Sequence, residues 1–90
     1  MNNTRRKKIN KISERVSDLR SQLEELLSEI EEVKDEEEEY RDNIPENMQS
    51  GERYERSDAA CDNLDDAYNS LEEAISSLEE VESSLDSAAE

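Results

Sequence analysis

Histidine, tryptophan and phenylalanine are missing from this chain of 90 residues, which has one glycine, one proline and one cysteine. Without imidazole or clustered thiols there is no zinc site. The acidic run from Asp35 to Glu39 lacks the Asp-x-Asp-x-Asp-Gly spacing of a calcium loop, so we expect no metal and no cofactor. Cys61 has no base within sequence reach and no Gly-rich phosphate loop is present, so we expect no enzymatic activity.

Long apolar runs are also missing, because 31% of the residues are hydrophobic and 42% are charged. Neither half of the chain has the ~20 consecutive apolar residues that a membrane-spanning helix needs. The basic start, Arg5 to Lys8, is followed by alternating charges rather than by an apolar segment, so we expect no secretion signal. We therefore expect a cytoplasmic protein, with Cys61 packed against Val33 as a small hydrophobe.

The sequence does contain a 3-4 spacing of apolar residues on both sides of one short interruption. The only glycine and the only proline lie in that interruption. This pattern predicts an all-α fold: one helical hairpin domain over residues 1–90 with a first helix at about 5–42, a turn at about 43–51 and a second helix at about 52–88. The two arms should pack as an antiparallel coiled coil, each roughly 55 Å long.

Folding the chain at Asn47 pairs heptad positions whose numbers sum to 94, from 9 with 85 to 40 with 54. Two layers of this seam are polar. Glu37 faces Ser57, which we expect to fix the register, and Glu82 faces Ile12. The predicted hairpin core consists of Ile9, Val16, Leu19, Leu23, Leu26, Ile30, Val33, Leu64, Tyr68, Leu71, Ile75, Leu78 and Leu85.

The connector predicts a sharp turn. Pro45 disfavours a helical conformation for the residue before it, so the first helix should end just before Pro45. Ser50 is the expected N-cap of the second helix, with Glu52 in its positive first turn. The tip should be closed by Ile44 and Met48, over Tyr40 and Tyr54.

The second helix repeats every seven residues, which favours a left-handed supercoil. Each repeat carries a small side chain beside the core leucine, and this row widens the apolar stripe beyond one seam. A second interface is implied, and we expect a homodimer that forms a four-helix bundle, or docking on a partner. The expected interface residues are Ala60, Ala67, Ala74, Val81 and Ala88.

Charge is segregated along the chain. Residues 1–20 have a net charge of +5 and residues 21–90 a net charge of −21. The basic segment Arg5 to Lys11 either forms a nucleic-acid-binding arm or neutralises the acidic end of the second helix, and we favour neutralisation. Across the seam the heptads predict two ion pairs, Arg20 with Glu72 and Lys34 with Asp58.

Adjacent acids recur every seven residues on the second helix, so they line one face at intervals of roughly 10.5 Å. A rod with rows of carboxylates resembles a nucleic-acid duplex electrostatically. We therefore expect a protein partner with a basic groove, such as a nucleic-acid-binding protein. The hairpin would block that groove by mimicking a nucleic acid. The predicted partner-binding residues are Asp65, Asp66, Glu72, Glu73, Glu79, Glu80 and Asp86.

The turn segment from Asp42 to Glu55, DNIPENMQSGERYE, and the acidic Leu/Ala heptads after it resemble small uncharacterised acidic coiled-coil proteins of Gram-positive bacteria and their phages and prophages. The group has no established activity, so the resemblance assigns no catalytic residue. It implies a mobile-element setting in the host cell cytoplasm, where the partner would be a host defence protein.

Three functions stay open. The leading one is the acidic inhibitor, the second is a self-assembling structural or adaptor coiled coil, and the third is a nucleic-acid binder that uses Arg5 to Lys11.

Overall fold

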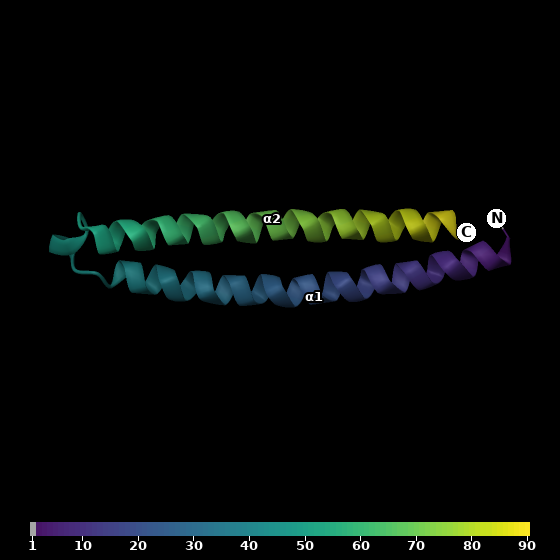
Figure 1. Ribbon diagram of the computed structural model, residues 1–90, viewed down its shortest axis with the longest axis horizontal. Coiled ribbons are helices and arrows are strands. Elements are labelled where there is room, and N and C mark those ends of the chain that lie inside the picture. The colour runs from purple at the N-terminus through teal and green to yellow at the C-terminus, as the bar shows by residue number, and fades with distance from the viewer. Residues whose placement is uncertain (1) are drawn as a thin grey trace.

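The computed structural model describes residues 2–90, and nearly all of them are helical (Figure 1). Helix α1 spans Asn3–Asp42 and helix α2 spans Glu52–Ala88, with a short 3-10 helix, η1, at Glu46–Met48 between them. The two long helices pack against each other in opposite directions, and no strand occurs in the described chain. The predicted helical hairpin is confirmed.

The hairpin is a thin rod. Its Cα atoms extend over 70 × 14 × 13 Å and have a radius of gyration of 20.2 Å. A compact domain of 90 residues would have a radius of gyration of about 12 Å. The protein therefore has one seam between two helices instead of a core enclosed on all sides.

The start of α1 and both helix boundaries at the turn follow from local chemistry. α1 starts where the Asn2 side chain accepts a hydrogen bond of 2.8 Å from the Arg5 amide, and it ends before Pro45, as predicted. The predicted Ser50 cap is wrong, because Gly51 is the N-cap of α2 and no side chain caps that end. Two acids in the first turn of α2, Glu52 and Glu55, face the positive end of the helix dipole instead.

The tip is closed by one residue. Ile44 is only 2% exposed, and the Gln49 side chain donates a hydrogen bond of 3.2 Å to its carbonyl oxygen. Met48 is 49% exposed, so the prediction that it also closes the tip is wrong. Ile44 is thus the buried apolar residue of the turn, whereas Met48, in η1, has half of its surface in solvent.

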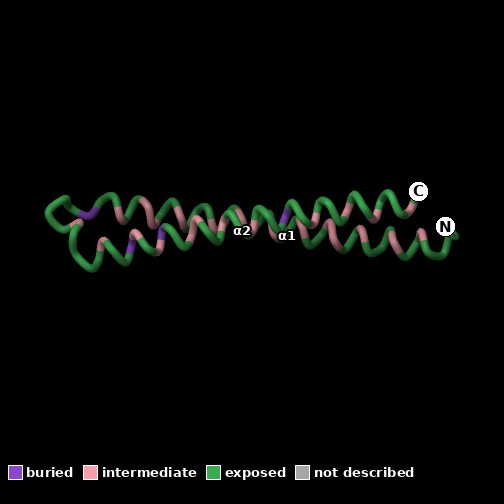
Figure 2. Tube along the Cα trace, turned by 90° about the horizontal axis from the view of Figure 1, so that it is seen from above, coloured by how far each residue is buried: buried purple, intermediate pink, exposed green. Residues whose placement is uncertain are grey.

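Few residues are fully buried along the rod (Figure 2). Besides Ile44, only Ser57, Cys61 and Ile75 fall below one-tenth exposure in the described residues. α2 contributes its leucine row to the seam, since Leu64, Leu71, Leu78 and Leu85 are half-buried. From α1, Ile9, Val16, Leu23 and Ile30 are half-buried.

The second core row predicted for α1 is wrong. In its place a mostly polar row of α1 faces α2, with Leu27 as its one apolar member. The half-buried residues of that row are Arg6, Ser13, Arg20, Leu27, Lys34 and Arg41. Leu19, Leu26 and Val33 are therefore not core residues, and they are 47%, 48% and 50% exposed. The reason is electrostatic, because the cations of the polar row reach carboxylates of α2.

Candidate functional site

Ion pairs line one flank of the seam. Lys34 Nζ lies 2.7 Å from Asp65 Oδ1, and Arg41 Nη1 lies 3.0 Å from Asp58 Oδ1. The predicted partner of Lys34 was Asp58, so that prediction is wrong by one heptad. The shift follows from the α1 rotation, because the cationic row now sits inside the seam and reaches about two turns further along α2.

Arg20 binds a carboxylate that was predicted to face an apolar residue. Its Nε lies 2.6 Å from Glu82 Oε2, and its Nη1 lies 2.9 Å from Glu24 Oε1. The predicted pairs of Arg20 with Glu72 and of Glu82 with Ile12 are therefore wrong. The hydrogen bond from Arg20 lowers the pKa of Glu82, and the bonds to both carboxylates raise the pKa of Arg20.

The predicted polar layer near the turn is confirmed. The Ser57 hydroxyl, 3% exposed, donates a hydrogen bond of 2.8 Å to Glu37 Oε1. This bond places residue 37 opposite residue 57, and its role in fixing the register stays a prediction. Cys61 is 2% exposed, and burial raises the pKa of its thiol. Its predicted packing partner, Val33, is 50% exposed, and the contact between the two side chains stays a prediction.

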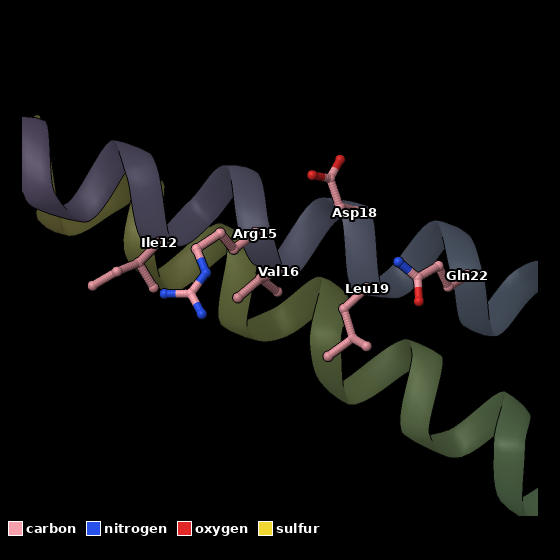
Figure 3. Close-up of a pocket in the computed structure, with 6 residues that line it drawn as sticks. All are labelled: Ile12, Arg15, Val16, Asp18, Leu19 and Gln22. Atoms are coloured by element: carbon pink, nitrogen blue, oxygen red, sulfur yellow. The ribbon is translucent and has the colours of Figure 1, made fainter.

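The other flank of the seam carries an apolar surface. Its α1 part is a row of large side chains spaced by seven residues, 46 to 50% exposed, which we name the exposed α1 stripe: Ile12, Leu19, Leu26, Val33 and Tyr40. In Figure 3 the side chains of Ile12, Val16 and Leu19 leave the same side of α1, whereas Asp18 leaves the opposite side. Together with Arg15 and Gln22 they line an open groove of about 470 Å³.

The small row of α2 lies on the same flank. The Arg53 guanidinium sits over the Tyr40 ring, 5.5 Å from its centre, so the start of this row meets the end of the exposed α1 stripe. Heptad spacing carries that relation along the rod. From Arg53 the row continues through Ala60, which is half-buried, and the exposed residues Ala67, Ala74, Val81 and Ala88.

Next to the small row of α2 runs a second uncharged row. It consists of Asn63, Ser70, Ser77 and Ser84, each exposed. The two rows alternate at intervals of three and four residues, which is the spacing of a second helix-packing seam. We name the exposed α1 stripe and these two α2 rows together the apolar flank. Its role as an oligomer interface stays a prediction.

The predicted acidic face splits into two groups. Asp65 is bound by Lys34, and Asp86 accepts a hydrogen bond of 3.3 Å from Ser13. The other five carboxylates are exposed and take part in no ion pair within residues 2–90: Asp66, Glu72, Glu73, Glu79 and Glu80. We name these five the free acids. They are exposed to solvent, so a partner can reach them.

The basic start of α1 lies beside the end of α2. Arg6 Nη1 donates to Asn3 Oδ1 at 3.1 Å, and Arg6 Nη2 donates to the Glu90 carbonyl oxygen at 3.3 Å. Arg6, one cation of this segment, thus contacts the residues that follow the end of α2. This contact favours the neutralisation that we expected over a free nucleic-acid-binding arm.

The part of the chain that the structure describes has no group of three potential ligand residues arranged around a metal position, and neither long helix has enough apolar length to cross a bilayer. No protein-family model, curated protein or solved structure matches the chain. Functional inference therefore depends on the two surfaces of the hairpin, the free acids and the apolar flank.

Sequence reasoning missed the exposed α1 stripe as a surface. The signal that could have found it is a row of cations at positions 6, 20, 34 and 41. Each residue of the stripe has one of these cations either six positions before it or one position after it. Three of those cations, at positions 20, 34 and 41, pair with the acids at positions 82, 65 and 58 of α2. Charge complementarity across the seam therefore decides which flank of α1 turns inward.

Proposed function

We propose that this protein is a non-enzymatic acidic binding protein that occupies the basic groove of a nucleic-acid-binding protein and so inhibits it. The observation that supports the proposal is where the charges lie. Arg20, Lys34 and Arg41 are paired with carboxylates in the seam, whereas the free acids are exposed and take part in no ion pair within residues 2–90. The hairpin thus pairs three of its cations internally and leaves these carboxylates in solvent, as a ligand for a basic groove requires.

The charge density gives the proposal a scale. A net charge of −16 over a rod 70 Å long is one charge per about 4.4 Å, against one per ~1.7 Å for duplex DNA. Such a rod would be steered toward a basic groove, and its binding would weaken as salt rises. The turn resemblance extends the proposal to a host defence protein in the cytoplasm of a bacterial cell that carries a mobile element.

The test compares two variants with equal loss of charge. The first replaces four of the free acids by glutamine, at Glu72, Glu73, Glu79 and Glu80. The control replaces four exposed acids elsewhere, at Glu25, Glu32, Glu39 and Glu46. Each immobilised protein is incubated with extract of a Gram-positive bacterium, and retained proteins are identified by mass spectrometry.

The expected result is a nucleic-acid-binding protein that the wild type and the control retain, that duplex DNA displaces, and that the first variant loses. Equal retention by both variants would show that only bulk charge matters. Retention that duplex DNA does not reduce would contradict mimicry.

A second candidate function is self-assembly as a structural or adaptor coiled coil, in which two hairpins form a four-helix bundle. The apolar flank favours it. The chain exposes 6631 Å², whereas a compact monomer of 10.4 kDa would expose about 5,400 Å². The difference of about 1,200 Å² is larger than the ~800 Å² that one copy contributes to a standard interface. Sedimentation equilibrium tests this candidate, and a monomer at micromolar concentration would exclude it.

A further inference from the structure

We infer that the apolar flank is covered by a second copy of this chain that lies antiparallel, with the two tips at opposite ends and a two-fold axis crossing α1 at Gln22. The inference rests on the self-assembly proposed above and adds the orientation and the register. It follows from three properties of the flank: the charge gradient along the rod, the charged row that borders the flank, and the spacing of its apolar residues.

The charge gradient disfavours a parallel pair. Residues 24–70, the half of the hairpin that contains the tip, carry 18 acidic and 4 basic side chains, a net charge of −14. The other half has a net charge of only −2, and residues 1–20 within it carry +5. Parallel copies would place −14 against −14. Antiparallel copies place each −14 half against the half that holds the cations, which is the favourable arrangement.

The row bordering the exposed α1 stripe is complementary to itself when reversed. Along α1 it reads Lys8, Arg15, Gln22, Glu29 and Glu36, all exposed. Turned about Gln22, Lys8 meets Glu36 of the second copy, Arg15 meets its Glu29, and Gln22 meets its own equivalent. Every charge thus finds the opposite sign, and the neutral residue lies on the axis.

Residues of the exposed α1 stripe also pair with those of the second copy about nearly the same point, Gln22. Ile12 comes opposite Val33 of the second copy and Leu19 opposite its Leu26, within one residue of the axis at Gln22. Val33 of the second copy approaches the groove that Ile12, Val16 and Leu19 line, where a β-branched side chain has room (Figure 3). On the other helix the uncharged rows meet each other, and small side chains allow two helices to approach closely.

The contact is large enough for a stable dimer. From position 12 to position 40 the stripe runs about 42 Å at 1.5 Å per residue, and two adjacent helices are about 20 Å wide. The covered surface is therefore about 840 Å² per copy, close to the ~800 Å² per partner of a standard interface. None of the free acids lies on the apolar flank, so they stay accessible.

Antiparallel pairing also evens out the charge. Each half of the dimer then carries one −14 half and one −2 half, so a net charge of −32 spreads uniformly over the 70 Å rod. That is one charge per about 2.2 Å, which approaches the ~1.7 Å of duplex DNA. The dimer would therefore be a better imitation of a duplex than either copy alone.

Thiol cross-linking tests the arrangement. Cys61→Ala provides a background without cysteine, and circular dichroism checks that it folds. Into it are introduced Gln22→Cys, Lys8→Cys or Glu36→Cys, one per chain, and a short bismaleimide is added to each protein alone and to a mixture of the Lys8→Cys and Glu36→Cys chains.

The expected products are covalent dimers of the Gln22→Cys chain with itself and of the Lys8→Cys chain with the Glu36→Cys chain. The Lys8→Cys chain alone should give none, because its two copies lie at opposite ends. A sedimenting dimer in which Lys8→Cys links to itself, or in which the mixed product is missing, would overturn the antiparallel arrangement. A monomer in sedimentation would instead overturn self-assembly itself.

Discussion

Shortening two leucines of the exposed α1 stripe should split the dimer without unfolding the hairpin. Leu19 and Leu26 are 47% and 48% exposed in one copy, so a second copy would cover about half of each side chain. Complete burial of a leucine contributes about 1.5–3 kcal/mol, and half of it about 1 kcal/mol. Two residues in each of two copies then contribute about 4 kcal/mol, which corresponds to a roughly thousandfold change in Kd.

The assay is sedimentation equilibrium of wild type and of the double variant Leu19→Ala/Leu26→Ala, with helicity followed by circular dichroism. Alanine is the best helix former, so helicity should be kept. The matched control, Glu25→Ala/Glu32→Ala, changes two exposed residues outside the stripe and should leave the Kd within a few fold. A double variant that dimerises as tightly as wild type would refute the assignment of the stripe to an interface.

Three further predictions concern the hairpin itself. Because Arg20 lowers the pKa of Glu82, this carboxylate contributes stability above the ordinary glutamate pKa and loses it as the pH falls through its lowered pKa. The melting-temperature gap between wild type and Glu82→Gln should therefore be full above the ordinary glutamate pKa and narrow as the pH falls through the lowered pKa of Glu82, and a gap that stays unchanged on acidification would contradict this. Burial raises the pKa of the Cys61 thiol, so an aromatic disulfide reagent should react with it far more slowly at pH 8 in buffer than in guanidinium chloride, and equal rates would mean that Cys61 is exposed. Ile44→Ala should cost about 2 kcal/mol or more of unfolding free energy because Ile44 is buried, whereas Met48→Ala, at a half-exposed position of the same turn, should cost clearly less; equal losses in thermal melts would show that Ile44 does not close the tip.

Heptad reading recovers the architecture because the fold has few parts. Pro45 and Gly51 are the only strong helix breakers, so the two helices and the turn between them follow directly from their positions. The Glu37 and Ser57 layer was also predictable, since both polar residues fall at core positions of the same pair. The cap of α2 was misplaced by one residue because serine and glycine are both common at that position.

The rotation of α1 could not be read from its own sequence. The row Ile9, Val16, Leu23 and Ile30 is flanked on one side by apolar residues and on the other by cations, and apolar spacing alone favours the apolar side. The structure chooses the cations because α2 offers Asp58, Asp65 and Glu82 at matching heights. Which flank turns inward thus depends on both helices together.

This choice gives the hairpin two different sides. On the flank with the ion pairs, cations of α1 bind carboxylates of α2. On the apolar flank, large side chains remain in solvent. The free acids are exposed and do not belong to the apolar flank, so assembly through the apolar flank and partner binding through the acids can occur in the same molecule.

Small-angle X-ray scattering at micromolar concentration tests most directly whether two hairpins lie fully side by side. We predict twice the 10.4 kDa mass of one chain, with a maximum dimension still close to the 70 Å length of a single hairpin. A mass of one chain, or a doubled mass with a much longer particle, would contradict it.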